Sequence, residues 1–151
     1  FNIFRQKAIT SISKEAQEKK VAIIVRLPLA SGLLSGKMNQ GSNFSENDHR
    51  NFNRDGQKFN VGETFSGLPF EKGLQLVDGL KRFAPDNLSQ FSLRWVLDFE
   101  AVSVVIPGSK NPHQVVDNCA ASALPPLKDK THKAINDFYL NEVAPHIRGK
   151  Y

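Results

Sequence analysis

The sequence has very few of the residues that build disulfide frameworks and metal centres. Its 151 residues include one cysteine, Cys119, and four histidines. A single cysteine excludes an intramolecular disulfide and a cysteine-rich metal site, and it fits a reducing, cytoplasmic setting. The histidines have no metal-ligand spacing and are expected at the surface: His49, His113, His132 and His146. We therefore expect no metal site.

Long apolar runs and a leader segment are also lacking. No stretch approaches the roughly 20 apolar residues that cross a bilayer, so we expect no membrane association. The chain opens with Phe1 rather than methionine, and the residues that follow do not form the apolar core of a signal peptide. We expect a chain cut from a longer protein. The glycosylation sequons at Asn43 and Asn87 are interpreted as chance matches.

Positive charge is in modest excess but is not concentrated. The net charge is +5, yet the basic residues are spread along the chain in short groups such as Lys19–Lys20 and Lys81–Arg82. No basic motif is interleaved with aromatic residues, so nucleic-acid binding is not expected. A modest positive balance suits a ligand that carries several phosphates.

Apolar residues at helical spacing predict several helices. Asn87 is a predicted N-cap with Gln90 in capping-box position, and Asn111 is a predicted N-cap followed by Pro112. Pro85 separates the second predicted helix from the third. The predicted helices are residues 8–19, 70–83, the segment after Asn87, the segment after Asn111, and 128–140.

The inward faces of these helices follow from the same spacing. Trp95 and its neighbours make the helix after Asn87 apolar nearly all round, which predicts a well-buried helix. Ile135 and Phe138 are expected to point inward from the last helix. The apolar side of the helix after Asn111 is predicted to consist of Val115, Val116 and Cys119.

Two continuous apolar runs, 21–25 and 102–106, predict strands buried on both faces, as in a parallel sheet. Phe1–Ile3 is a candidate strand end. Residues 39–69 lack periodicity, and loops of this length are usually functional or disordered. Within them, segment 47–54 is expected either to fold over a bound cofactor or the substrate pocket, or to be a solvated, mobile loop.

This order of elements is typical of parallel α/β proteins. It belongs either to an open doubly wound sheet or to a (β/α)8 barrel. Two or three strands cannot close a barrel, which needs eight strands and typically about 250 residues. The sequence therefore predicts part of a larger architecture.

Small and polar residues follow each predicted strand. Pro28–Lys37, PLASGLLSGK, contains two glycines that permit close backbone approach, two serine hydroxyls and one lysine, which together suit a pyrophosphate. It is not a P-loop, because only three residues separate Gly32 from Gly36 and Met38 stands where a magnesium-binding hydroxyl is needed. Without a partner motif, such a turn is also compatible with a purely structural role.

The second stretch, Ile106–Asn118 or IPGSKNPHQVVDN, runs into the start of a predicted helix, where free N–H groups attract an anion. Ser109 and Lys110 are placed to meet a phosphate. Gln114 and Asn118 lie one turn apart on the same helix face. Capping of the helix by Asn111 and Gln114 is the purely structural alternative, and it is compatible with phosphate binding.

The order and spacing of PLASGLLSGK and IPGSKNPHQVVDN resemble the aldo-keto reductase family through essentially the whole chain. The resemblance implies the C-terminal portion of a (β/α)8 barrel, a single unit over 1–151, with 21–25 as the seventh strand and 102–106 as the eighth. It also implies an extended NADP(H) bound across the carboxyl ends of the strands. The implied cofactor-binding residues are Arg26, Leu27, Pro28, Leu29, Ala30, Ser31, Gly32, Leu33, Ser35, Gly36, Lys37, Ile106, Pro107, Gly108, Ser109, Lys110, Gln114, Asp117 and Asn118.

Within that set the resemblance assigns different parts of the cofactor. Residues 27–37 would line the pyrophosphate and nicotinamide ribose, Ser109 and Lys110 the 2′-phosphate, and Gln114, Asp117 and Asn118 the adenosine. Arg26 departs from the aromatic residue that many members stack on the nicotinamide, although a guanidinium also stacks. Gln114 replaces an arginine of many members, which leaves Lys110 as the main cation for the 2′-phosphate.

The catalytic residues implied by the resemblance are not found in this chain. The family's Asp, Tyr, Lys and His come from earlier strands, whereas the two tyrosines here, Tyr139 and Tyr151, lie near the C-terminus. We expect the parent protein to transfer hydride between NADPH and an aldehyde or ketone, and this chain alone to be inactive. Two alternatives remain: a non-catalytic NADP-sensing subunit of the same fold, and a structural barrel fragment.

Overall fold

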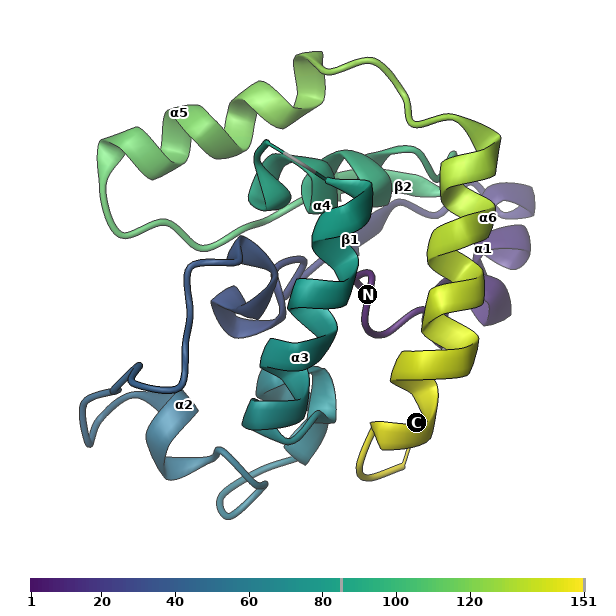
Figure 1. The fold of residues 1–151 in the computed structure, drawn as a ribbon. Helices are drawn as coiled ribbons and strands as arrows, with labels where there is room; N and C mark the ends of the chain where they lie inside the picture. Colours follow the sequence, from purple (N-terminus) through teal and green to yellow (C-terminus); the bar gives the residue numbers. More distant parts are fainter. Residues whose placement is uncertain (85, 151) are drawn as a thin grey trace.

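The computed structural model describes residues 1–84 and 86–150, so the predicted break at Pro85 and the residue Tyr151 lie outside the described residues. Apart from the short helix α2 within loop 39–69, which was not predicted, the helices and strands follow the predicted order (Figure 1). In chain order they are α1 (Lys7–Glu18), β1 (Ile23–Val25), α2 (His49–Phe52), α3 (Phe70–Leu80), α4 (Leu88–Leu97), β2 (Val102–Val105), α5 (Pro112–Ala120) and α6 (Asp129–Phe138). Short 3₁₀ turns join them: η1 (Ala30–Ser35), η2 (Val61–Glu63), η3 (Phe65–Gly67), η4 (Lys81–Phe83), η5 (Ala121–Ala123) and η7 (Ala144–His146).

The two strands pair in parallel, as predicted. Ile23 is opposite Val102 and Val25 is opposite Val105, with a register irregularity after Ile23. The parallel arrangement requires a crossover, which here contains α3 and α4. Because the strands are parallel neighbours, the turns that follow them lie at the same edge of the sheet.

The prediction that both strands are buried on both faces is wrong. Val25 is buried, but the alternate residues Ile24 and Val104 are 61% and 43% exposed. Helix α4 contacts β2 on one side, whereas no described element covers the side that carries these two residues. Ile106, just after β2, is also exposed.

The core lies between the sheet and helices α3, α4 and α6. Trp95 of α4 is buried, as predicted, and its ring contacts those of Phe1 and Phe99. His132 stacks on the same ring, and its Nε2 lies 2.8 Å from Oδ2 of the buried Asp98. The expectation of a surface position for His132 is therefore wrong, because this pairing draws it against α4.

Local capping follows the sequence closely. The Asn87 side chain accepts a hydrogen bond from the Gln90 N–H at 3.1 Å, and the Asn111 side chain accepts one from the Gln114 N–H at 2.9 Å. The other half of the predicted capping box is wrong. The Gln90 amide donates instead to the Asp117 carbonyl, which ties the start of α4 to α5.

Helix α5 crosses one end of the molecule (Figure 1) and has no buried residue. Its predicted apolar side, Val115, Val116 and Cys119, is exposed, because no described element packs on it. By contrast, Ile135 and Phe138 of α6 point inward as predicted. The helical path continues past α6 through the π-helical turn η6 (Tyr139–Val143), which buries Tyr139.

The N-terminal residues do not form the candidate strand end. They form a turn closed by hydrogen bonds between Asn2 and Arg5, which buries Ile3 and Phe4. Residues 39–69 are anchored by buried side chains, Asn53, Phe65 and Leu68 among them. Among the described residues, no helix has the length and apolar character to cross a membrane.

Candidate functional site

The turn after β1 has an unusual backbone. Leu27, Ala30 and Ser31 have φ of 53°, 50° and 58°, in the left-handed region that non-glycine residues rarely adopt. Such conformations cost on the order of 1–3 kcal/mol each and persist where the surroundings impose them. Here the buried Asn2 donates to the Leu27 carbonyl at 2.9 Å, and Leu33 is fully buried.

Ser31 is the polar centre of this turn. Its hydroxyl donates to the Glu63 carbonyl at 3.2 Å, and its Oγ also lies 3.2 Å from Nε2 of His49. Ser35 donates to the Gly32 carbonyl at 2.7 Å. The first turn is thus built before any ligand binds.

The turn after β2 is held mainly by the helix that follows it. The Gln114 side chain accepts a hydrogen bond from the Lys110 N–H at 2.6 Å, and the Asn118 amide donates to Ser109 Oγ at 3.0 Å. Because Ser109 Oγ accepts from Asn118, its own O–H is left to donate to a further acceptor. A Cβ placed on Gly108 would meet nothing within 4 Å.

The two turns and part of loop 39–69 enclose one cavity of about 760 Å³, within the range of small-molecule and cofactor sites. The loop contributes α2, whose first residues face the turn after β1. Residues of the predicted set that line the cavity are Leu27, Pro28, Leu29, Ser31, Gly32, Ser35, Lys37, Ile106, Gly108, Ser109, Lys110, Gln114, Asp117 and Asn118.

Asp48 and Arg50 form a charge pair at this cavity. The Arg50 guanidinium donates to both Asp48 carboxylate oxygens and lies 4.4 Å from the Phe44 ring centre. The side-chain hydrogen bond from Arg50 lowers the Asp48 pKa to about 2. The pair therefore stays ionised at neutral pH, with a half-buried His49 beside it.

Five predicted residues lie off the cavity lining. Arg26 pairs with Glu63 at 2.6 Å, outside the cavity. Ala30 and Leu33 are core residues beneath the turn, and Gly36 adopts a left-handed conformation against Leu88. The fifth residue is Pro107. A ligand-binding role for these residues remains a prediction.

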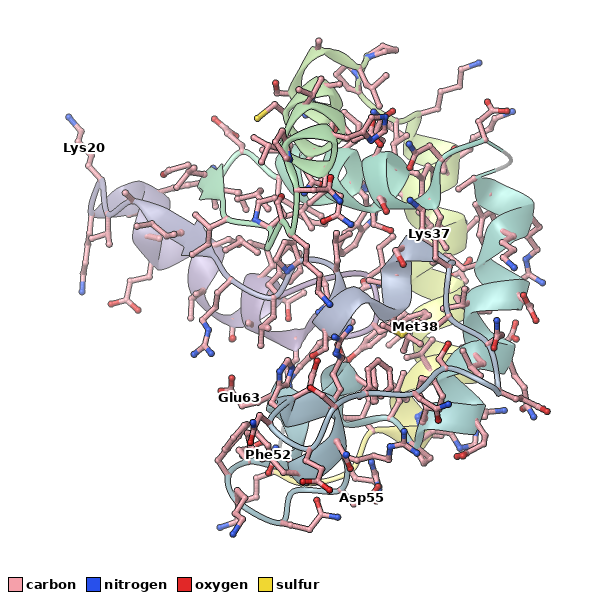
Figure 2. All side chains as sticks on the ribbon, turned by 90° about the vertical axis from the view of Figure 1, so that its left-hand side faces the viewer. Lys20, Lys37, Met38, Phe52, Asp55 and Glu63 are labelled. Carbon is pink, nitrogen blue, oxygen red and sulfur yellow. The ribbon has the colours of Figure 1, made fainter. Side chains whose placement is uncertain are left out.

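Sequence reasoning did not assign several residues that line the cavity. The sequence predicts a surface position for His49 and only a capping role for Asn87. For segment 47–54 it leaves open a position over the cavity or a mobile loop, and in the structure residues 47–50 line the cavity. Only the length of the loop signalled this role. The added lining residues are Met38, Asn47, Asp48, His49, Arg50, Asn87 and Ser89. Figure 2 places Lys37 and Met38 between α3 and the turn, and Phe52 and Asp55 at the outer end of the loop.

The cavity offers the Ser109 hydroxyl, the N-terminal end of α5 and the basic side chains of Lys37 and Lys110, which together suit a ligand with several phosphates. Within 1–84 and 86–150, no group of three His, Cys, Asp or Glu side chains could hold a metal ion. Tyr139 does not line the cavity.

A sequence model of the aldo/keto reductase family matches residues 1–140. The chain belongs to this family. It is 28% identical over 140 residues to "Aldo-keto reductase yakc [NADP(+)]" of Schizosaccharomyces pombe, covering 91% of this chain and 38% of that protein. It is 26% identical over 115 residues to "Aldo-keto reductase YhdN" of Bacillus subtilis, covering 76% of this chain and 33% of that protein.

Two solved structures are also similar to this chain. A glycerol dehydrogenase, AKR11B4 from Gluconobacter oxydans, superposes with a TM-score of 0.76 at 27% identity, over all of this chain and 44% of that one. The holo form of aldo-keto reductase AKR11C1 from Bacillus halodurans gives 0.62 at 20% identity, over 91% of this chain and 40% of that one, and this shows the fold alone. The chain thus spans less than half the length of these relatives. Its parallel strand pair and flanking helices are consistent with part of an α/β barrel.

Proposed function

We propose that this chain is the NADP(H)-binding part of an aldo-keto reductase that transfers hydride between NADPH and an aldehyde or ketone. One observation carries the proposal. The turns after two adjacent parallel strands, 27–37 and 106–118, line a single cavity. Ligands of α/β proteins bind at this edge of the sheet.

The residues present fit the cofactor. The Ser109 hydroxyl and the positive end of the α5 dipole suit the 2′-phosphate, with Lys110 as its cation. In the turn after β1, Lys37 supplies a cation and Gly32 permits close backbone approach, which suits the pyrophosphate. When bound, NADPH supplies the hydride, and the residues of this chain bind it and fix its orientation.

We further propose that the catalytic residues, and the strands that complete an eight-stranded barrel, lie outside this chain. Residues 1–151 would form one unit with β1 and β2 as the seventh and eighth strands. The exposed side of the strand pair, with Ile24, Val104 and Ile106, would then be covered by the rest of the barrel. On this proposal the isolated chain is inactive and the complete protein binds a small carbonyl substrate.

The test is a fluorescence titration of the complete gene product with NADPH and with NADH. We expect at least about a tenfold preference for NADPH, which corresponds to roughly 1.4 kcal/mol. Lys110→Ala should reduce this preference, because it should lower the affinity for NADPH and leave the affinity for NADH nearly unchanged. Equal affinity of the wild type for the two nucleotides would contradict the assignment of the 2′-phosphate site.

A further inference from the structure

Arg148, close to the C-terminus, binds two separate parts of loop 39–69. Its backbone N–H and Nε both donate to the Gly67 carbonyl, at 3.1 and 3.0 Å, and Nη2 donates to the Leu68 carbonyl at 3.1 Å. Nη1 lies 2.6 Å from Oδ1 of Asp55, and Nη2 also reaches the Arg54 carbonyl at 3.4 Å. One guanidinium thus joins two loop segments, 54–55 and 67–68.

The backbone around this contact is shaped to allow it. Gly67 has φ of 84°, and a Cβ there would lie 2.9 Å from the Arg148 carbonyl oxygen. Gly149 has φ of 82°, and a Cβ there would lie 2.8 Å from Val61 Cγ1. Any side chain at either position would push the C-terminal segment off the loop.

We call residues 47–55 the first limb of the loop and residues 60–68 the second, and on the cavity side Ser31 contacts both. The first limb reaches it through the His49 ring and the second through the Glu63 carbonyl. Between the two limbs, the buried Asn53 donates to Thr64 Oγ1 at 3.2 Å and accepts from two loop N–H groups. The limbs are therefore held together by Ser31 at the cavity and by Arg148 away from the cavity lining. Both the loop and the C-terminal segment lie in the lower half of Figure 1.

We propose that Arg148 is a positioning residue for the dinucleotide site. It fixes the two limbs of the loop so that His49 and Arg50, at the start of the first limb, lie against the turn after β1. A guanidinium suits this role because its planar fork serves several acceptors at once. The inference rests on the proposed function, since it concerns the affinity of the same cavity for NADPH.

The test compares Arg148→Ala and Arg148→Lys with wild type in the complete gene product. The loop is probed without ligand by the rate of tryptic cleavage after Arg54 and Lys58, and the site by the Kd for NADPH. For Arg148→Ala we expect cleavage to quicken by about tenfold or more and the Kd to rise roughly tenfold. Arg148→Lys should give intermediate values, because lysine can pair with Asp55 but cannot also serve the three carbonyls.

Arg82→Ala is the matched control. Arg82 is an exposed arginine paired with Glu142 at 3.3 Å, away from the loop and the cavity, so neither quantity should change more than about twofold. In the complete enzyme, the KM for NADPH should rise in Arg148→Ala while kcat at saturating NADPH stays within about twofold.

The outcomes separate the two proposals. Faster cleavage in Arg148→Ala with an unchanged Kd would overturn the inference, since Arg148 would then hold the loop without serving the site. Unchanged cleavage and unchanged Kd would overturn it equally. If the wild type itself does not bind NADPH, the proposed function fails, and the inference fails with it. If Arg148→Ala does not fold, the same comparisons apply to Arg148→Lys.

Discussion

The two turns that form the candidate site differ sharply in how they are held. The turn after β1 rests on the fully buried Leu33 and is contacted by Asn2, His49 and Glu63 from elsewhere in the chain. The turn after β2 is exposed and depends mainly on hydrogen bonds from its own helix.

This difference indicates that the two turns contribute differently to ligand binding. The first turn has its geometry fixed by the folded chain, including backbone conformations that an isolated segment would not adopt. The second has few contacts beyond α5 and the bond from Gln90 to Asp117. We expect the first turn to be preorganised and the second to be ordered further by the ligand.

The largest expected effect comes from removing the buried side chain that supports the turn after β1. Leu33→Ala should lower the free energy of unfolding by about 2–5 kcal/mol, because it opens a cavity beneath the turn. Val116→Ala, at a position 69% exposed on α5, is the matched control and should cost about 0.5 kcal/mol or less. Urea denaturation of the complete protein measures both. Similar losses in the two variants would remove the contrast between the turns.

The next effect concerns the charge pair that places the loop against the first turn. The Asp48 pKa is lowered from its ordinary value of 3.8 to about 2, mainly by the hydrogen bond from Arg50. Because the folded-state pKa is the lower one, this contribution to stability is present above about pH 4 and is lost as the pH falls toward 2.

Asp48→Asn should therefore lower stability at pH 6 and flatten its dependence on pH below 5. Asp86→Asn, at an exposed carboxylate, is the control and should retain the wild-type slope. Urea midpoints measured from pH 6 to pH 3 give the comparison. A wild-type slope in Asp48→Asn would mean that the pair contributes nothing to the fold.

The smallest effect tests the second turn. Asn118→Ala removes the donor that orients the Ser109 hydroxyl, and a neutral hydrogen bond is worth roughly 0.5–1.5 kcal/mol. The Kd for NADPH should rise about two- to tenfold. Asn141→Ala serves as control, since Asn141 donates only along its own helix, to the Asp137 carbonyl. An unchanged Kd in Asn118→Ala would show that the ligand does not use this arrangement.

Sequence alone predicted well the features that depend on near neighbours. The caps at Asn87 and Asn111 follow from a partner three residues away, and the parallel strands follow from apolar runs and their spacing. The wrong predictions concern partners far along the chain. Gln90 bonds 27 residues away rather than within its own helix, and His132 pairs with Asp98 across 34 residues.

The prediction that the strand residues are buried on both faces was wrong for a different reason. Ile24 and Val104 have the character of buried residues, and the sequence reflects the surroundings of the whole barrel that we propose. The chain as described contains nothing that covers them. The lining by α2 could not be predicted in detail either, because a polar loop carries no periodic signal that places its side chains.

The left-handed residues of the first turn also restrict how this protein can diverge. Position 31 can accept glycine or asparagine without a backbone penalty, whereas valine, isoleucine or threonine would be strained there. Position 30 carries the same backbone restriction and is buried as well, so only small side chains fit. Few residue types are therefore compatible with positions 30 and 31, although both lie in a segment whose sequence resembles an ordinary loop.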